Sequence, residues 1–557
     1  MLFLFLPKPN HFLDMRILSF FAALLLIVAC ADDKKPVDML VVNANIYQVD
    51  NDFLKAEAMA ISEGKIVAIG STEDLTMQYE AGQMVDAAGK TIVPGLIDGH
   101  AHLFNLGLSL QQVDLVGTTS KQDVLDRVVA FQKKNNLDYI QGRGWDQNDW
   151  EVKEFPSKED LDALFPDTPV ALRRIDGHAL WINSKALSLT TITAQTKMDG
   201  GEVILKDGEP SGVLVDAPMS LVGATVPKLS DAVAAKAILD AQEVCFSYGL
   251  TTINEAGASR WVISMMDSLQ QANEMKLRMY AMISAGDTAA MTYYFNEGIY
   301  KTDRLNVRSV KVYGDGALGS RGAALRAPYS DQEGHFGAMS TKQEDLFSMA
   351  NRIAKAGFQM NTHAIGDSAN VAVLRAYKNA LAGKKDSRWK VEHAQIISQE
   401  DFVYFGLNII PSIQPTHATS DMYWAEDRLG PDRIKGAYSY KTLLDRAGLV
   451  VLGTDFPVEL VNPFHTFYAA VSRKDLKGYP ADGFRSDQAL TREQTLRGMT
   501  IWAAYSNFEE AEKGSLEVGK FADFVILDQD LMTVPIEQIP NTKALKTFVG
   551  GQLVFKQ

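Results

Sequence analysis

The sequence predicts an α/β protein: a (β/α)8 TIM-type barrel with an inserted subdomain, plus a small β-sandwich built from both chain ends. Three observations support this fold class. Eight buried-type strands alternate with amphipathic helices between about residues 91 and 505. Shorter β-type runs flank this middle part on both sides. The chain has 557 residues, whereas a single hydrophobic core rarely grows beyond about 250–300 residues, so more than one structural unit is expected.

The order of the elements predicts the barrel. Strands that alternate with helices favour a parallel sheet, and eight such units favour a closed barrel over an open doubly wound sheet. No Gly-x-Gly-x-x-Gly follows the first strand, which weakens a dinucleotide-binding alternative. The predicted strands are 92–102, 251–255, 278–283, 309–313, 358–363, 389–393, 408–413 and 449–455, and the helices between them include 231–248, 261–273, 341–356 and 368–381.

The remaining segments divide the chain into further units. We expect residues 38–90 and 511–557 to form one composite β-sandwich beside a barrel of residues 91–510. About 150 residues, 103–250, separate the first two barrel strands. Structureless loops of that length are uncommon, so this stretch is predicted to be an inserted subdomain on the C-terminal face of the barrel. Insertions at that face usually shape substrate choice.

The N-terminus has the pattern of an export signal. Residues 17–29 form an apolar run that is too short for a comfortable membrane span, so 1–29 are predicted to be a signal peptide. The run ends Ile-Val-Ala-Cys, which resembles a bacterial lipoprotein signal. We therefore predict lipid attachment at Cys30, with 30–37 as a polar tether, in the bacterial periplasm or cell envelope. An ordinary signal peptide and an uncleaved anchor are the alternatives.

Charge and cysteine content argue against nucleic-acid binding and against a disulfide-based fold. The formal net charge of −14 and the lack of long basic runs argue against nucleic-acid binding. The two cysteines, Cys30 and Cys245, cannot build a disulfide framework, and Cys245 is expected to be a small buried hydrophobe. A lipid anchor would be the chain's one contact with a membrane. The oligomeric state stays open.

His100 and His102 are the first candidate metal ligands. They stand two residues apart at the end of the first strand, and a period of two places both imidazoles on one face. At the C-terminal mouth of a barrel such a pair can bind a metal ion. By itself a His-x-His pair is weak evidence for a metal site.

Other predicted strands also end in ionisable residues. Lys311 lies near the end of the fourth strand, and His363, His393 and Asp455 end the fifth, sixth and eighth. Each has a structural alternative: a hydrogen-bonded core histidine, a helix N-cap for Asp455, or a buried ion-pair partner for Lys311. Ionisable groups gathered at a barrel mouth favour a catalytic site, so the set as a whole favours a metal centre.

This order of residues resembles the amidohydrolase superfamily, and several motifs look like its N-substituted formamide deformylase branch. The resemblance covers residues 37–554, which is nearly all of the expected mature chain. Its motifs are Pro-Gly-Leu-Ile-Asp-Gly-His-Ala-His (94–102), Asp-Gly-Ala-Leu-Gly-Ser-Arg-Gly-Ala (315–323), His-Ala-Ile-Gly-Asp (363–367), Val-Glu-His-Ala-Gln (391–395), Leu-Gly-Thr-Asp-Phe-Pro-Val (452–458) and Gly-Ser-Leu-Glu-Val-Gly-Lys-Phe-Ala-Asp-Phe (514–524).

The resemblance implies a divalent metal cofactor, with zinc expected, as one or two ions. His100 and His102 would hold the more buried ion with Asp455 close by, and His363 and His393 would hold the second. Lys311 would be a carboxylated lysine that bridges both ions. An unmodified lysine ammonium cannot ligate a cation, so an unmodified Lys311 would favour a single ion.

The implied chemistry is cleavage of a C–N bond in a small amide-type substrate by metal-bound hydroxide, with Asp455 as general base. His178 is a candidate for holding the tetrahedral oxyanion, although a structural role is an equal alternative. Trp145, Asp176 and Arg321 are weaker candidates for substrate binding, and His417 is a candidate to line the pocket.

Three other functions stay open. The same site could hydrolyse an ester or a lactone. A non-catalytic barrel scaffold is disfavoured because the ligand set is complete. A solute-binding lipoprotein fits the signal but not the ligands.

Overall fold

The structure is a computed structural model that describes residues 1, 2, 4, 34–198 and 201–557. Most of the predicted signal peptide, Cys30 and the first half of the tether (30–33) lie outside the described residues. Within the described part of the chain, no helix is both long enough and apolar enough to cross a bilayer.

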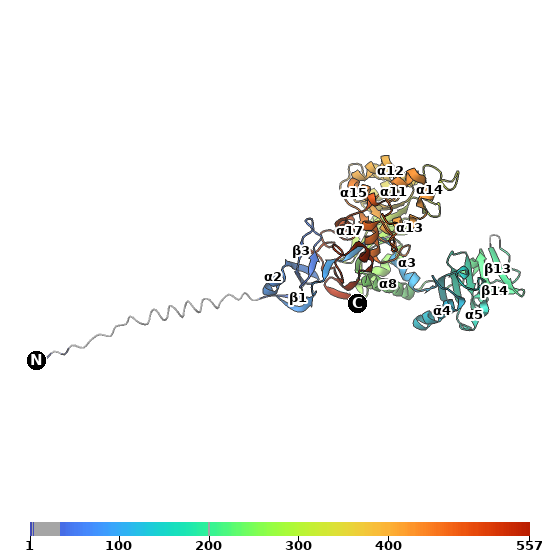
Figure 1. The fold of residues 1–557 in the computed structure, drawn as a ribbon, viewed down its shortest axis with the longest axis horizontal. Helices are drawn as coiled ribbons and strands as arrows, with labels where there is room; N and C mark the ends of the chain where they lie inside the picture. The colour runs from blue at the N-terminus through green and yellow to red at the C-terminus, as the bar shows by residue number, and fades with distance from the viewer. Residues whose placement is uncertain (3, 5–33, 199–200) are drawn as a thin grey trace.

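Both chain ends build the β-sandwich, as predicted. One sheet has the order β5-β4-β1-β6 and the other β25-β24-β23-β7-β2-β3. In the second sheet β7 pairs antiparallel with β23, so segments from the two parts of the chain that flank the barrel form one sheet, and the C-terminus lies close to the blue strands of the sandwich in Figure 1. The strands are β1 Lys35–Val42, β2 Asn45–Tyr47, β3 Lys55–Ala56, β4 Ala58–Ser62, β5 Lys65–Gly70, β6 Tyr79–Asp86, β7 Thr91–Pro94, β23 Phe524–Leu527, β24 Ala544–Val549 and β25 Gln552–Lys556; α2 Thr72–Gln78 packs beside the first sheet.

Eight parallel strands form the barrel in the predicted order. They are β8 Leu96–Ala101, β15 Leu250–Ala258, β16 Arg278–Ser284, β18 Leu305–Tyr313, β19 Gln359–Ala364, β20 Lys390–His393, β21 Ile410–Ile413 and β22 Val451–Leu452. The amide of Asp455, just after β22, donates to the carbonyl oxygen of His100 at 2.8 Å, and the amide of His102 donates to that of Phe456 at 2.9 Å. These bonds tie the last strand to the first at the C-terminal mouth.

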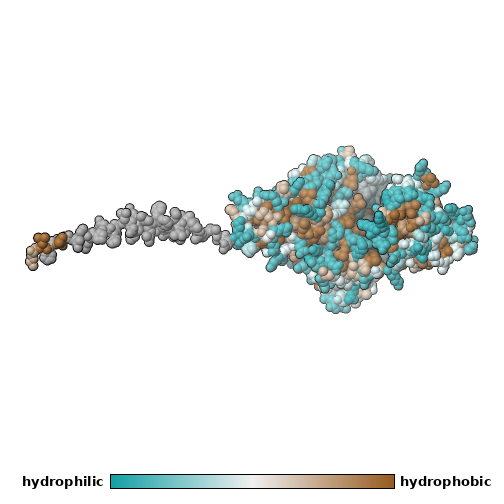
Figure 2. Space-filling model, turned by 90° about the horizontal axis from the view of Figure 1, so that it is seen from below, coloured by the Kyte–Doolittle hydropathy of each residue, from teal (hydrophilic) through white to brown (hydrophobic). Residues whose placement is uncertain are grey.

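Helices cover the outside of the barrel, and a short β17 Tyr300–Lys301 pairs with β18. The helices are α8 Asp231–Ser247, α9 Arg260–Gln271, α10 Thr288–Glu297, α11 Gln343–Ala356, α12 Asp367–Ala380, α13 Pro415–Asp421, α14 Ala425–Arg433, α15 Tyr440–Ala447, α16 Pro463–Ser472, α17 Arg492–Gly498 and α18 Ile501–Ser506, with 3₁₀ turns η2 Gln399–Leu407, η3 Ile434–Gly436, η4 Ser486–Gln488 and η5 Ile536–Asn541. On the face shown in Figure 2, apolar side chains lie in small groups among hydrophilic ones.

The first predicted strand, 92–102, is two strands in the structure. β7 belongs to the sandwich and β8 to the barrel, with Gly95 between them. A Cβ atom on Gly95 would lie 2.2 Å from the hydroxyl oxygen of Thr251, so only glycine allows this close approach. The apolar run continues across the break because both strands are buried, and for that reason the pattern did not reveal the boundary.

The insertion between β8 and β15 folds as a unit of its own. The chain leaves the barrel through α3 Leu103–Leu110 and returns through α8, and the insert stands beside the barrel in Figure 1. Its sheet has the order β13-β14-β12-β11-β10-β9. Its elements are β9 Val113–Asp114, α4 Lys121–Asn135, β10 Ile140–Trp145, η1 Gln147–Asp149, α5 Lys158–Asp162, β11 Val170–Arg174, β12 Ala179–Ile182, α6 Ser184–Ser188, β13 Gly201–Lys206, β14 Glu209–Asp216 and α7 Met219–Gly223.

Candidate metal centre

The predicted ligands converge at the C-terminal mouth of the barrel. His100 ends β8 and His102 follows it, Lys311 lies in β18, and His363 lies in β19. His393 ends β20, and Asp455 follows β22. Because the carboxyl ends of parallel barrel strands meet on one face, residues more than 350 positions apart in sequence become neighbours.

The tightest group consists of His100, His393 and Asp455. One ligand atom from each lies within 4.8 Å of the others, and all three residues are buried. His102 joins them, because its Nε2 lies 3.2 Å from Asp455 Oδ1. The ring of His363 lies 4.5 Å from that of His393, centroid to centroid. The predicted set is therefore one spatial cluster.

Lys311 lies at the centre of this cluster. Its Nζ is 2.9 Å from His100 Nε2, and the residue is 1% exposed. Burial lowers the pKa of Lys311 to about 8, although the nearby carboxylates of Glu392 and Asp455 oppose the shift. Near neutral pH a fraction of Lys311 is therefore the neutral amine, which is the form that reacts with carbon dioxide.

Burial favours the neutral form of His100, His363 and His393. It lowers the pKa of His100 to about 4 and that of His363 to about 3, and in both cases the charge of Lys311 adds to the effect. Burial and the neighbouring His363 also lower the pKa of His393. Neutral imidazole is the form that ligates a metal ion.

Asp455 supplies the anionic group. Burial would raise its pKa, but the neighbouring imidazoles of His102, His100 and His393 outweigh burial and lower the pKa below the usual range. Its Oδ1 atom is buried, with His102 Nε2 3.2 Å away, and makes no hydrogen bond of regular geometry to the described residues. Neutral imidazoles around an unsatisfied carboxylate oxygen are a donor set that fits a divalent metal ion such as zinc.

The carboxylate of Glu392 and the side-chain amide of Gln414 orient two of the proposed ligands. Neither residue was predicted from the sequence. The Nδ1–H of His100 donates to Glu392 Oε2 at 2.5 Å, and the Nδ1–H of His393 donates to Gln414 Oε1 at 2.8 Å. Each bond fixes the tautomer and leaves Nε2 for the centre. Glu392 lies next to His393 in sequence, and its place on a buried strand is the one signal that could have revealed it.

Lys390 balances the charge of Glu392. The two side chains are fully buried, with Lys390 Nζ 3.5 Å from Glu392 Oε1. Burial would raise the pKa of Glu392, but the charge of Lys390 and the hydrogen bond from His100 lower it to about 2. Glu392 therefore stays an acceptor for His100.

Asp98 and Gly453 fix the backbone on either side of the centre. Asp98 accepts hydrogen bonds from the amides of His100 and Thr454 and from the Thr454 hydroxyl, the last at 2.7 Å. A Cβ atom on Gly453 would lie 2.5 Å from the amide nitrogen of His100. His393 and Asp455 have φ angles of 71° and 63°, in the left-handed region that non-glycine residues seldom adopt. Such backbone strain gathers at functional sites.

The other predicted substrate residues lie outside this cluster. His178 follows β11 in the insert; its side chain is 72% exposed, and its Nδ1 lies 2.6 Å from Asp216 Oδ1. Asp176 forms an ion pair with Arg174 of the insert. Trp145 is buried in the core of the insert, where its indole N–H donates to the carbonyl oxygen of Leu172 at 2.8 Å. Their proposed contact with substrate stays a prediction.

Arg321 belongs to the long segment between β18 and α11. Its guanidinium forms an ion pair with Asp331, with 2.8 Å between Nη2 and Oδ2, and its carbonyl oxygen lies 2.8 Å from His335 Nε2. These contacts hold the segment together. Its role in substrate binding also stays a prediction.

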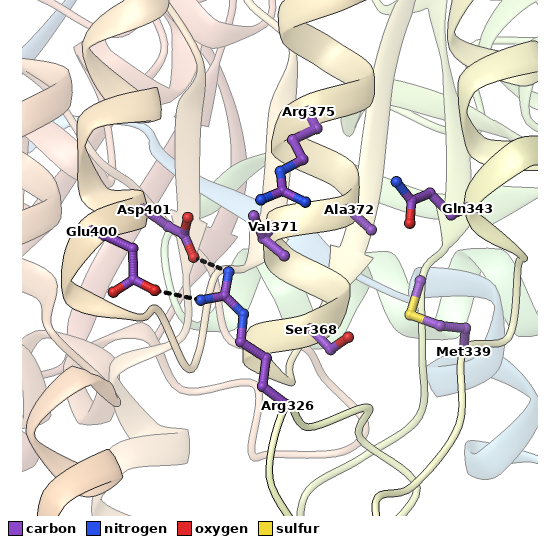
Figure 3. A pocket seen from close by; sticks show the side chains of 9 residues that line it. All are labelled: Arg326, Met339, Gln343, Ser368, Val371, Ala372, Arg375, Glu400 and Asp401. Carbon is purple, nitrogen blue, oxygen red and sulfur yellow. Dashed lines mark hydrogen bonds and ion pairs between the residues drawn. The ribbon is translucent and has the colours of Figure 1, made fainter.

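A cavity of about 310 Å³ lies beside α12, away from the ligands (Figure 3). Arg326 reaches across it to the carboxylates of Glu400 and Asp401 in η2. The amide of Arg326 also donates to Asp367 Oδ1 at the start of α12, at 2.9 Å. Arg326 therefore anchors the segment after β18 to the outside of the barrel.

Comparison with known proteins agrees with this arrangement. A family model described as "Amidohydrolase family" matches residues 83–555, so the chain belongs to the amidohydrolase family. The chain is 32% identical to Protein LONG AFTER FAR-RED 3 of Arabidopsis thaliana, over 93% of this chain and 91% of the relative. It is 24% identical to N-substituted formamide deformylase of Arthrobacter pascens, over 93% of this chain and 98% of the relative.

A solved structure confirms the fold. The crystal structure of an uncharacterized metal-dependent hydrolase from Pyrococcus horikoshii superimposes with a TM-score of 0.74. The match covers 89% of this chain and 99% of that protein, at 27% sequence identity. The predicted fold class and the predicted family resemblance are both confirmed.

Proposed function

We propose that the protein is a metal-dependent hydrolase that cleaves a C–N bond in a small amide-type substrate: an amide, an N-substituted formamide or a cyclic amide. The observation that carries the proposal is the buried cluster of His100, His393 and Asp455, with Lys311 beside it. The names of the Pyrococcus structure and of the Arthrobacter deformylase support the metal and the bond type, respectively.

His100, His102 and Asp455 would hold one ion, and His363 and His393 a second. A bound divalent metal supplies two effects: it lowers the pKa of water from about 15.7 to about 7 and polarises a carbonyl group. The chain supplies the rest. Burial excludes bulk water, and Glu392 and Gln414 hold the imidazoles in place.

Asp455 is the proposed general base. Its two oxygens face different groups: Oδ1 lies 3.2 Å from His102 Nε2, whereas Oδ2 lies 3.7 Å from His417 Nε2. Because its pKa is lowered, the carboxylate is ionised at neutral pH and can accept the proton of the attacking water. That proton then passes to the leaving amine, which makes the amine a better leaving group.

Asp455→Asn tests this role. Asparagine keeps the shape of the side chain but cannot accept a proton, so turnover of a panel of N-formyl, N-acyl and cyclic amides should fall by at least about a hundredfold. The assay is product release from metal-loaded protein. Glu459→Gln, which alters an acidic residue farther along the same loop, is the matched control. Retention of most activity in Asp455→Asn would remove Asp455 as the base.

Lys311 is the proposed bridging ligand, as a carbamate formed from its neutral amine and carbon dioxide with loss of a proton. Metal analysis of protein prepared with bicarbonate should then find two ions per chain, and Lys311→Ala should retain one at most. Two ions in Lys311→Ala would contradict the bridging role, and a folded wild-type protein without transition metal would contradict the metal proposal altogether.

A further inference from the structure

His417 is a partly buried histidine of the barrel mouth that the proposed ligand set does not use. It lies in α13, directly after β21, so the seventh barrel strand also delivers an ionisable side chain to the mouth. Pro415 starts the helix, and the amide of His417 donates to the carbonyl oxygen of Gln414 at 3.1 Å. The helix start therefore fixes the position of the His417 backbone.

The imidazole of His417 lies against the metal centre. Its ring is stacked on that of His393, with 5.8 Å between centroids and 18° between planes. Its Nε2 points towards Asp455 and lies 3.7 Å from Oδ2. That distance is too long for a hydrogen bond. His417 is also absent from the tight group of His100, His393 and Asp455.

The Nε2 atom of His417 is buried and makes no hydrogen bond to any described residue. Buried polar groups in folded proteins nearly always have a partner, and an exception calls for an explanation such as a catalytic role or a missing ligand. The contrast with His393 is informative, because Gln414 satisfies the Nδ1 of that residue. The Nε2 atom of His417 is therefore free to form a hydrogen bond with a molecule that enters the centre.

We propose that His417 is a catalytic residue whose Nε2–H donates a hydrogen bond to the carbonyl oxygen of the substrate. The oxygen becomes negatively charged in the tetrahedral intermediate, and a donor aimed at that position stabilises the charge. The proposal rests on the proposed hydrolytic function for the identity of this oxygen. It does not depend on which amide is the substrate.

The geometry favours this role over a structural one. A structural histidine would bond to a neighbour, as His465 does to Asn462 at 3.1 Å. The Nε2 of His417 makes no such bond and faces the carboxylate that receives the proton of the attacking water. The zinc content of His417 variants separates a donor from a metal ligand, because His102 and His363 also lie outside the tight group.

Binding of inorganic phosphate to zinc-loaded protein tests the proposal without turnover. Phosphate is a tetrahedral oxyanion, so it presents to the centre the charge that the intermediate would present. Calorimetry would compare wild type with His417→Ala, which removes the donor, and His417→Gln, which retains an N–H. His465→Gln is the matched control, and zinc content is measured for each variant.

We expect His417→Ala to bind phosphate about tenfold or more weakly, as for a lost hydrogen bond to a charged group. His417→Gln should stay within about threefold of wild type, His465→Gln should match wild type, and all variants should keep their zinc. If His417→Ala does not fold, His417→Leu takes its place, because leucine fills the space without a donor.

Three outcomes would overturn the proposal. Equal phosphate affinity in wild type and His417→Ala would show that the donor is not used. Loss of zinc in His417→Ala would make His417 a ligand. A wild-type centre that holds zinc but binds no phosphate would show that it does not recognise an oxyanion. Failure of the proposed function is separate, since it would appear as zinc-loaded protein that binds phosphate but cleaves no amide.

Discussion

Glu392 controls the orientation of His100 through one hydrogen bond. In Glu392→Gln the acceptor for the Nδ1–H of His100 loses its charge, which weakens the hydrogen bond that holds the imidazole in place. Loss of such an outer partner lowers metal affinity by about 10–100-fold. Competition with a zinc chelator would measure this change. Glu400→Gln, on the exposed side of η2, should leave zinc affinity unchanged, and an unaffected Glu392→Gln would contradict the role.

The side chain of His178 is paired with that of Asp216. The hydrogen bond and charge of Asp216 raise the pKa of His178 above its ordinary value of 6.5. Because the folded-state pKa is raised, the pair's contribution to stability is present below pH 6.5 and is lost as pH rises through the folded-state pKa. The pair is exposed, so the contribution is small.

Asp216→Asn should return the His178 pKa towards 6.5. The imidazole proton signals of His178 in an NMR titration would show the shift directly. A His178 pKa that is the same in both proteins would contradict the pairing.

The proposed metal ligands could be placed at the barrel mouth as a set, because each lies near, at or just after the end of a strand with an apolar pattern. Glu392 and Lys390 could not, because they lie inside a strand that is buried on both sides. In such a strand apolar and polar residues do not alternate, so the sequence pattern does not show which side chains face the site. The left-handed backbone of His393 and Asp455 leaves no mark in the sequence either, since the surrounding fold imposes it.

At the scale of elements, the insert is the most independent part of the molecule. Its two hydrophobic clusters contain insert residues alone. In the part of the chain that the structure describes, no hydrogen bond or ion pair joins residues 113–226 to the rest. Residues 112–227 expressed alone should therefore fold, and thermal unfolding followed by circular dichroism should show one cooperative transition. A transition without cooperativity would contradict this independence.

Trp145 stabilises this unit from its centre. Its ring contacts those of Trp150 and Trp181, with centroids 6.0 and 6.2 Å away. Trp145→Ala should destabilise the insert by about 3–5 kcal/mol, because it removes a large buried side chain and leaves a cavity. Urea unfolding of the whole protein should show an early transition of the insert. Zinc content should stay at the wild-type level, and its loss would instead link Trp145 to the metal centre.

The eight barrel strands could be predicted from the sequence, because each is a short hydrophobic run of the length of a buried strand. The mixed sheet of the insert did not, because β10 pairs with β9 and β11 in parallel while β12 and β14 pair antiparallel. Such pairings depend on residues that are far apart in sequence. The boundary at Gly95 was hidden for a different reason: burial continues across it.

At the scale of the whole molecule, one buried ion pair fastens the sandwich to the barrel. Arg278 at the start of β16 bonds to both oxygens of Asp523, just before β23, at 2.6 and 2.9 Å. Both side chains are 4% exposed. Asp523→Ala would leave the buried guanidinium unpaired and should cost about 3–5 kcal/mol of unfolding free energy.

Urea unfolding would measure this loss. Asp432→Ala, which breaks an exposed pair with Lys435, should change stability by at most about 1 kcal/mol. Equal effects of the two substitutions would contradict the anchoring role of Asp523.

Attachment to a membrane through Cys30 remains a proposal from the sequence. Cells that express the protein with radiolabelled palmitate should label the wild type, and Cys30→Ser should remove the label. Cys245→Ser is the control, because Cys245 is buried in the barrel. Label that persists in Cys30→Ser would contradict the lipoprotein assignment.

The attachment of the insert through α3 and α8 has an evolutionary consequence. Two chain crossings separate a unit with its own core from a barrel that carries every proposed metal ligand. Recombination at those crossings could exchange one insert for another without breaking the catalytic framework. Relatives that retain the six proposed ligand positions can therefore differ widely in the insert. A graft of a foreign insert between α3 and α8 should yield a folded, zinc-binding chimera.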